Sequence, residues 1–381
     1  MPYAGPARDR SETEQAVALA GRVFSPAAEN SERTTDRKRL LVLDHPGAGK
    51  NPAIVVSLPD KGVIGTAFLI DRVFPRDPAM IHGTFISSIC IDEGVRGLGY
   101  SRILMAAAID ACKARGSAIA LVIARRAADH FYTQFGFWGL SQYSKLTVDA
   151  AALSATPTSE LCLRPAIADD LPICAVLYDT AYQESFGRCL RDSQTWRYVL
   201  EKATCLHVCL SVVENSGSVV GYAIHDDAGN VHELAIAGSA TARGTLALLA
   251  GRNVGSSLLL HVSPDHPVIS ALSGLDITLS TRECPFGGHM VRVLDAASLA
   301  TAAERRIEQH AHLFGLAPQT ETVAGIHAVW DGTSARLRVD GLVDGLAATA
   351  RLCGAARVSS FDGNSQLDPP VSFNIPLVDQ S

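Results

Sequence analysis

A glycine-rich turn carries the clearest chemical potential in this sequence. The residues Arg96-Gly97-Leu98-Gly99-Tyr100-Ser101 stand between a β-branched stretch (84–91) that predicts a strand and a long apolar pattern (101–115) that predicts a helix. Glycines there leave the backbone N–H groups at the start of the helix unobstructed. Because this helix end also carries partial positive charge, it is suited to bind an anion, and a pyrophosphate is the expected guest. Taken alone, the same residues also fit a tight turn without a ligand.

The turn and a later aromatic segment together resemble the GCN5-related N-acetyltransferase (GNAT) superfamily. That family has an acetyl-CoA loop, Arg/Gln-x-x-Gly-x-Gly/Ala, followed by a helix, a strand and a Phe-Tyr-x-x-x-Gly-Phe segment. Here VRGLGYSRIL (95–104) and FYTQFGF (131–137) keep that order and spacing over roughly residues 60–148. A Rossmann dinucleotide-binding turn needs a different glycine spacing and an acidic residue about 20 positions further on, so that alternative is set aside. The resemblance implies an enzyme with acetyl-CoA as cosubstrate and no metal.

The resemblance assigns roles to individual residues. The pyrophosphate loop of the family matches Arg96, Gly97, Leu98, Gly99, Tyr100 and Ser101. Ser101 replaces the usual final Gly or Ala but keeps its backbone N–H. The strand end whose backbone binds the pantetheine arm and orients the acetyl carbonyl matches Ile89, Cys90 and Ile91.

Tyr132 matches the tyrosine that protonates the departing CoA thiolate. The role suits a phenol, because a group with a pKa near 10 stays protonated at neutral pH and can donate to a developing sulfur anion. The alternative is that Tyr132 only packs in the core beside Phe131.

The general base is harder to place. Many members of the family use a glutamate on the strand before the loop, and that position falls here on Ser87 or Ser88. Four titratable residues lie nearby in sequence and are interpreted as surface or turn residues rather than bases: His82, Asp92, Glu93 and His130.

The remainder of the chain resembles the Eis-type (enhanced intracellular survival) acetyltransferases, which join a GNAT domain, a degenerate GNAT-like half and a sterol-carrier-like C-terminal domain. MVRVLDAASL (290–299) resembles the start of that last domain, and FNIPLVDQS (373–381) resembles a tail that runs into the active site. The resemblance implies that the C-terminal carboxylate of Ser381 is the base. GSATARGTLALLAG (238–251) stands where the second half would carry its CoA loop and does not match it, so that half is expected to bind no CoA.

The expected fold class is α/β (α+β), with tandem GNAT-like mixed sheets followed by a small α+β domain. The predicted domains are 1–158 (catalytic GNAT), 159–296 (degenerate GNAT-like) and 297–381 (sterol-carrier-like). The order of helices and strands restarts after a linker at 149–160, which indicates an internal duplication.

Local patterns predict the individual elements. In the first half a helix begins at Ser11 and residues 25–39 form a loop; strands are expected at 40–43, 53–58, 63–70, 84–91, 118–124 and 139–148, and helices at 101–115 and 128–135. In the second half a helix is expected to follow Asp169, with strands at 205–213, 218–225, 231–237 and 258–262. The C-terminal segment is expected to contain helices at 297–313 and 341–352 and strands at 326–330 and 335–339.

Composition excludes several classes of function. The 381 residues are 47% hydrophobic with a net charge of −6, a globular balance that argues against a nucleic-acid partner. No apolar run approaches the roughly 18 residues of a membrane span, and the N-terminus lacks the apolar core of a signal peptide. Nine cysteines without a C-x-x-C pair predict reduced thiols in a cytoplasmic protein rather than a zinc site.

Two polar features outside the motifs have competing interpretations. Cys205, His207 and Cys209 are predicted to share one face of a strand, where buried thiols are favoured over a metal site. Glu233, in the strand 231–237, is expected either to contact a cationic substrate or to belong to a charge pair.

The leading prediction is an acetyl-CoA-dependent GNAT-type N-acyltransferase. Its acceptor would be a primary amine, on a small molecule, an amino sugar or aminoglycoside, or a lysine side chain, and the amine would attack the thioester directly. The alternative is a non-catalytic acyl-CoA-binding or regulatory protein that kept the loop and lost the base. A small-molecule amine is the expected partner, without nucleic acid or membrane, and a homo-oligomer is left open.

Overall fold

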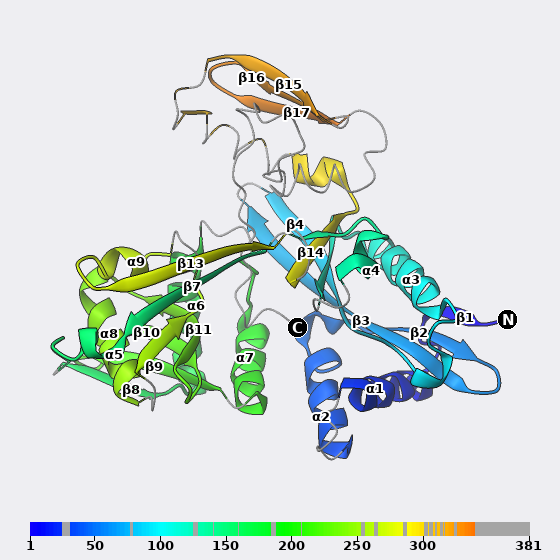
Figure 1. The fold of residues 1–381 in the computed structure, drawn as a ribbon, viewed down its shortest axis with the longest axis horizontal. Coiled ribbons are helices and arrows are strands. Elements are labelled where there is room, and N and C mark those ends of the chain that lie inside the picture. Colours follow the sequence, from blue (N-terminus) through cyan, green and yellow to red (C-terminus); the bar gives the residue numbers. More distant parts are fainter. Residues whose placement is uncertain are drawn as a thin grey trace. The chain divides into compact units, whose positions relative to one another are not determined.

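The chain forms two compact units in the computed structural model (Figure 1). Unit 1 contains Met1–Ser141 and the described residues from Cys284 onward, and unit 2 contains the described part of Gln142–Glu283. The structure describes residues 1–339 except for 25–30, 77–78, 125–128, 140, 159, 184–187, 207, 253–255, 263–265, 285–287, 301–303, 305–307, 309–310, 313–314, 316 and 324–325.

Unit 1 is built on a seven-stranded mixed sheet. Its strands lie in the order β1 (Tyr3–Pro6), β2 (Ala53–Leu58), β3 (Gly62–Arg76), β4 (Ala79–Ile91), β5 (Ile119–Ala124), β14 (Gly288–Val293) and β6 (Trp138–Gly139). Neighbouring strands are antiparallel except β4 and β5, which run parallel. The helices of this unit include α1 (Arg10–Phe24), α2 (Ser31–Val42), α3 (Tyr100–Ala114) and α4 (Asp129–Thr133).

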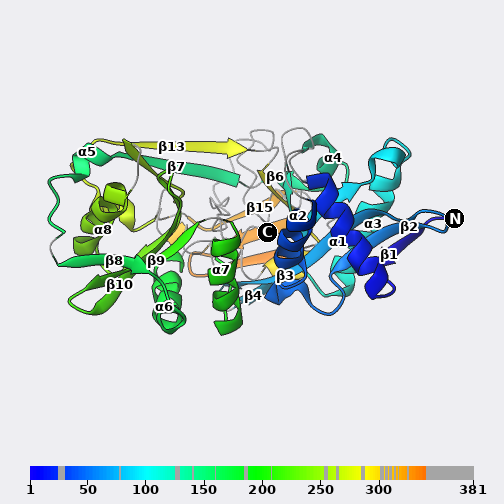
Figure 2. The same cartoon turned by 90° about the horizontal axis from the view of Figure 1, so that it is seen from below.

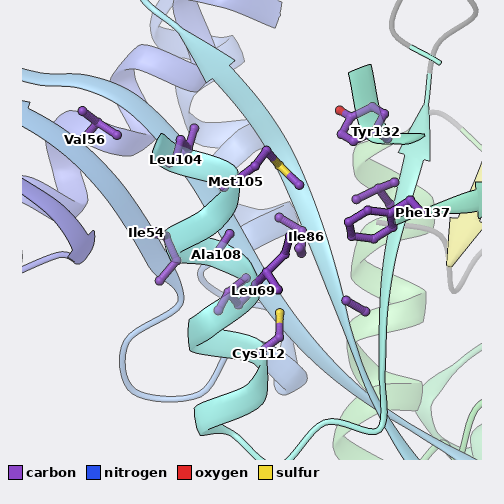
Figure 3. Close-up of a cluster of buried hydrophobic side chains, with 14 of the residues drawn as sticks. Ile54, Val56, Leu69, Ile86, Leu104, Met105, Ala108, Cys112, Tyr132 and Phe137 are labelled. Atoms are coloured by element: carbon purple, nitrogen blue, oxygen red, sulfur yellow. The ribbon is translucent and has the colours of Figure 1, made fainter. Parts of the chain in front are cut away.

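Each face of this sheet has its own hydrophobic core, because successive strand residues point to opposite faces. On one face Val55 and Phe68 pack with the buried side of α1, and α1 and α2 lie in front of the strands in Figure 2. On the other face Leu104, Ala108 and Cys112, one helical turn apart along α3, pack with residues of β2, β3 and β4 (Figure 3).

Helix α2 overturns two predictions. It runs from Ser31 to Val42 through residues predicted as a loop (25–39) and as a strand (40–43). The stretch contains neither Gly nor Pro and is rich in Arg, Lys and Leu, which favour helices. A run of four apolar residues does not by itself distinguish a strand from the last turn of a helix, and here Val42 packs into the core on the α1 face.

The first helix forms as predicted, one residue earlier than expected. Helix α1 begins at Arg10, and the Oδ1 atom of Asp9 accepts a hydrogen bond from the backbone N of Glu12 at 2.9 Å. Asp9 therefore caps the helix.

Unit 2 has the same order of elements as unit 1: one strand, two helices, three antiparallel strands, a helix and a strand parallel to the one before it. Its sheet has the order β13 (Ile277–Cys284), β7 (Ser141–Asp149), β12 (Ser257–Leu260), β11 (Asn230–Ile236), β10 (Ser218–His225), β9 (Cys209–Asn215) and β8 (Leu161–Pro165). Its helices are α5 (Ala150–Leu153), α6 (Leu171–Tyr182), α7 (Ser193–Cys205), α8 (Ser239–Arg252) and α9 (Val268–Ala271). The predicted fold class, with two similar mixed sheets in tandem, is confirmed.

Two strands complete sheets that are remote from them in the chain. Strand β7 follows α4 in sequence but pairs with β12, where Leu146 faces Leu260. Strand β14 follows the whole of unit 2 in sequence but lies between β5 and β6, where Met290 pairs with Val122. The domain boundaries at 158 and 296 stay predictions, and a chain cut at residue 158 would leave the unit 1 sheet without β14.

Some expectations for the second half fail locally. Helix α7 ends at Cys205 and β9 begins at Cys209, so these cysteines do not share a strand, and His207 lies outside the described residues. The linker predicted at 149–160 contains the short helix α5.

A small antiparallel sheet follows in the C-terminal segment. Its strands are β15 (Gln319–Val323), β16 (Ile326–Trp330) and β17 (Ala335–Val339), the last two as predicted. The predicted helix at 341–352 and the tail at 373–381 lie outside the described residues. Within the described part of the chain, no helix has the length and apolar character needed to cross a membrane.

Candidate active site

The two parallel strands of unit 1 separate near the glycine-rich turn. Strand β4 pairs with β5 only from Gly83 to Phe85, and its remaining stretch, Ile86–Ile91, continues without β5. The opposite edge of β4 stays paired with β3 up to Ile91. Among the described residues, the β5-facing edge of this stretch therefore has no strand partner, and its backbone groups are oriented to bond an extended ligand.

A bulge marks the point at which β4 leaves β5. Thr66 of β3 pairs with Cys90, and Phe68 pairs with Ser87, so β4 contains one additional residue there. Ser88 has φ 51°, a left-handed backbone that is strained in a residue other than glycine. Bulges of this kind redirect a strand beside functional sites. The hydroxyl oxygens of Ser87 and Ser88 lie 3.5 Å apart at this bulge.

The glycine-rich turn leads into α3 without a side-chain cap. Gly97 and Gly99 have φ 80° and 86°, which glycine adopts without the cost that a Cβ brings. Gly99 is the N-cap of α3 and offers no side-chain acceptor. Within the described residues, the backbone N–H groups of Tyr100 and Ser101 have no acceptor. These donors at the positive end of a helix suit a pyrophosphate.

Arg96 is held against the end of β4. Its Nε atom donates to the carbonyl oxygen of Ile91 at 3.2 Å, and its Nη1 atom lies 3.2 Å from Glu93 Oε1. The guanidinium remains half exposed. A cation in this place complements the phosphate charge expected at the turn.

Tyr132 lies on α4 and its ring is buried. The residue is 8% exposed, and its ring meets those of Phe131 and Phe137 edge-on, at 5.3 and 6.2 Å between centroids. Its hydroxyl bonds to none of the described residues and points away from Phe137 in Figure 3. Burial raises the pKa of Tyr132 to about 12, so the phenol is protonated at neutral pH.

The strand-end residues Ile89, Cys90 and Ile91 divide between the two faces of the sheet. Ile89 and Ile91 pack against the α3 core, and Cys90 is buried in the core beneath α1. Burial raises the pKa of the Cys90 thiol to about 12, so it is neutral and unsuited to nucleophilic attack. What these residues offer a ligand is their backbone.

The acids near the turn are engaged in the structure. Asp92 accepts a hydrogen bond from Gly94 N and pairs with Arg22 at 2.9 Å, and the Gly94 bond lowers the pKa of Asp92. Glu93 pairs with Arg96. These contacts agree with a structural role for both acids. Ser381, the expected base, lies outside the described residues.

Lys38 is a polar residue of this region that the sequence did not single out. Its Nζ atom donates to Ser88 Oγ at 3.2 Å. Its position depends on helix α2, and the sequence was wrongly predicted to form a loop and a strand there.

Unit 2 carries a carboxylate at the corresponding strand position. Glu233 follows Val231, the last residue of β11 that pairs with β12, by the same interval as Ser87 follows Phe85 in β4. Glu233 is fully buried in a bidentate pair with Arg191, so the charge-pair interpretation is confirmed.

The comparison with protein families decides what kind of domain unit 1 contains. The model of the acetyltransferase (GNAT) family matches residues 24–137. Residues 24–137 form a GNAT acetyltransferase domain. The match spans α2, β2–β5, α3 and α4, and so includes the bulge, the turn and Tyr132, and the resemblance recognised in the sequence is confirmed.

Solved structures share the fold over nearly the whole chain. A GCN5-related N-acetyltransferase from Kribbella flavida is 16% identical, with a TM-score of 0.70, and the match covers 99% of this chain and 97% of that one. One from Anabaena variabilis is 14% identical, with a TM-score of 0.66 and coverages of 93% and 92%. Eis1 from Mycobacterium abscessus is 14% identical, with a TM-score of 0.59 and coverages of 92% and 90%. No curated protein sequence matches this chain significantly.

Proposed function

We propose that the protein is an acetyl-CoA-dependent N-acetyltransferase whose GNAT domain acetylates a primary amine. The observation that carries the proposal is the separation of β4 from β5 beside the uncapped start of α3. An open strand edge and a helix start without a side-chain cap thus follow each other closely in the chain. A long ligand with an amide-containing arm and a diphosphate, such as acetyl-CoA, matches both.

In this proposal the GNAT domain binds acetyl-CoA at two places. The backbone N–H groups at Gly99–Ser101 bond the pyrophosphate, with the Arg96 guanidinium beside them. The open edge of β4 at Ile89–Ile91 bonds the pantetheine arm as an added strand would. A backbone N–H of the same edge polarises the thioester carbonyl oxygen.

The transfer requires one bond to form and one to break. The neutral amine attacks the thioester carbonyl, so that the C–N bond forms and the C–S bond breaks. The amine loses a proton to a base, and the Tyr132 hydroxyl gives its proton to the thiolate sulfur. A phenol that is protonated up to high pH and bonded to no described residue is suited to that donation.

Acetyl-CoA binding tests the cosubstrate site directly. Arg96→Glu combined with Leu98→Glu adds two carboxylates to an exposed turn and leaves the core intact. Because these charges repel a pyrophosphate, we expect calorimetry to show acetyl-CoA affinity falling at least about tenfold with melting temperature unchanged. Leu190→Glu, at an exposed leucine of unit 2, is the matched control and should bind normally. Unchanged affinity in the double variant would refute the site.

We also propose the C-terminal carboxylate of Ser381 as the base that takes the proton of the amine. The support is that the nearby groups are poorly suited to this role. Strand β4 carries hydroxyls at Ser87 and Ser88 instead of a carboxylate, and the carboxylates of Asp92 and Glu93 pair with arginines. Appending a few residues to the C-terminus moves that carboxylate away. We expect kcat to fall by about 10²–10⁴-fold, the usual contribution of a general base, while acetyl-CoA affinity and melting temperature stay unchanged. Full turnover by the extended chain would exclude Ser381 as the base.

A non-catalytic acyl-CoA-binding protein is the second candidate. The observation that favours it is the pair of serines at the β4 bulge in place of a carboxylate. It predicts acetyl-CoA binding with no release of CoA in the presence of any amine, whereas the enzyme predicts amine-dependent release.

A further inference from the structure

Lys38 holds a positive charge beside the β4 bulge. Its Nζ atom bonds Ser88 Oγ at 3.2 Å and lies 4.5 Å from the centroid of the Phe24 ring, at the end of α1. The side chain is half-buried. Two contacts from two elements thus fix an ammonium at the residue where β4 turns away from β5.

The surroundings of Ser88 contain further cations. Lys38, Arg22 and Arg96 all favour the ionised form of the neighbouring Cys90 thiol, and Asp92 opposes them. Unit 2 is the internal comparison, because its corresponding strand position holds the carboxylate of Glu233. In unit 1 that position holds Ser87, next to the serine to which Lys38 donates. This strand position therefore holds a carboxylate paired with Arg191 in unit 2, and in unit 1 a serine next to the one that bonds Lys38.

We propose that Lys38 selects acceptor amines that carry an anionic group, a carboxylate or a phosphate, close to the amine. The inference rests on the proposed function. An attacking amine must come within about 3–3.5 Å of the thioester carbonyl, which the open edge of β4 orients. The substituents of that amine then lie at the bulge, within reach of the Lys38 ammonium. An anion there gains a charge-assisted hydrogen bond, and a second ammonium is repelled.

The test compares amines with and without an anionic group. β-Alanine is paired with β-alaninamide, and phosphoethanolamine with ethanolamine, while putrescine represents a dication. The full chain is assayed with acetyl-CoA for kcat/KM by release of the CoA thiol. We expect the anionic member of at least one pair to exceed its neutral partner by about 10- to 100-fold, the range of a hydrogen bond to a charged group, and putrescine to be the poorest acceptor. A preference within the β-alanine pair indicates a carboxylate, and a preference within the phosphoethanolamine pair indicates a phosphate.

Variants at position 38 separate charge from packing. Lys38→Met and Lys38→Gln should reduce the anionic preference to within about threefold, because a loss of the ion pair removes most of that 10- to 100-fold factor. Lys38→Arg should retain the preference. Lys61→Met, on the exposed turn between β2 and β3, is the matched control and should behave as the wild type. Melting temperature and acetyl-CoA affinity are measured for each variant, since a purely structural role would change stability and leave the preference intact.

Three results would overturn the selection by Lys38. These are a preference that survives in both Lys38→Met and Lys38→Gln, faster acetylation of putrescine than of both anionic amines, and a wild-type enzyme that acetylates both neutral partners as fast as their anionic counterparts. Failure of acetyl-CoA to bind, or binding without release of the CoA thiol for any amine, is a different result, which removes the proposed function and the inference with it.

Discussion

Tyr132→Phe is expected to lower kcat by about 10²–10⁴-fold with little change in KM for acetyl-CoA. The substitution removes a hydroxyl that bonds to none of the described residues and retains the ring that packs against Phe131 and Phe137. Because the phenol acts only as the C–S bond breaks, its loss is felt in the transition state and not in ground-state binding. Melting temperature should therefore stay within a few degrees of the wild type.

A neighbouring aromatic residue provides the control for Tyr132. Phe135→Leu removes an aromatic contact with Phe131, 5.1 Å away between ring centroids, and retains the phenol. It should lower the melting temperature more than it lowers kcat, the opposite of what Tyr132→Phe does. A Tyr132→Phe enzyme with kcat within twofold of the wild type would reduce Tyr132 to a packing residue.

Arg191→Met is expected to destabilise unit 2 by about 3–5 kcal/mol, the cost of leaving a buried charge without its partner. The Nη1 and Nη2 atoms of Arg191 bond the two carboxylate oxygens of Glu233 at 2.8 and 2.7 Å, and both side chains are buried. Tyr222 donates its hydroxyl to the same carboxylate, and the guanidinium lies 3.9 Å from the centroid of the Tyr178 ring. Without Arg191, the buried Glu233 carboxylate keeps the Tyr222 hydroxyl but loses the bidentate cation that bonds both of its oxygens.

A double variant distinguishes the buried charge from lost packing. Arg191→Met with Glu233→Gln removes both charges and keeps an amide oxygen for the Tyr222 hydroxyl, so it should recover part of the lost stability. Asp179→Asn, which removes the charge of the exposed Asp179 in its pair with Arg188, is the control and should cost at most about 1 kcal/mol. Urea unfolding of each variant measures these differences. A cost for Arg191→Met no greater than that for Asp179→Asn would show that the buried pair contributes little.

Local motifs allowed the form of the glycine-rich turn to be predicted. The turn at 96–101 and Tyr132 owe their form to adjacent residues, since glycines permit the left-handed backbone and a strand and a helix flank the turn. The roles of these residues stay predictions, whereas the strand before the turn, the helix after it and the short helix with Tyr132 form as expected. The bulge at Ser88 left no sequence signal, because a serine with positive φ depends on the register between β3 and β4.

Features that depend on distant pairing could not be predicted. The assignment of β7 to the sheet of unit 2 and of β14 to the sheet of unit 1 rests on hydrogen bonds between residues far apart in sequence, and every strand pattern is compatible with either sheet. The wrong secondary-structure prediction for residues 31–42 also hid a residue of the candidate site. With that stretch taken as a loop and a strand, nothing indicated that Lys38 would approach Ser88.

Acetyl transfer itself is tested most directly by mass spectrometry. The full chain is incubated with acetyl-CoA labelled with ¹³C in the acetyl group and with the five amines above, a lysine peptide and an aminoglycoside. We predict that labelled acetyl appears on at least one amine, with one CoA thiol released for each acetyl group transferred, and that Tyr132→Phe slows both together. Saturable binding of acetyl-CoA with no acetylated amine above the uncatalysed rate would contradict acetyl transfer and identify the protein as an acyl-CoA-binding one.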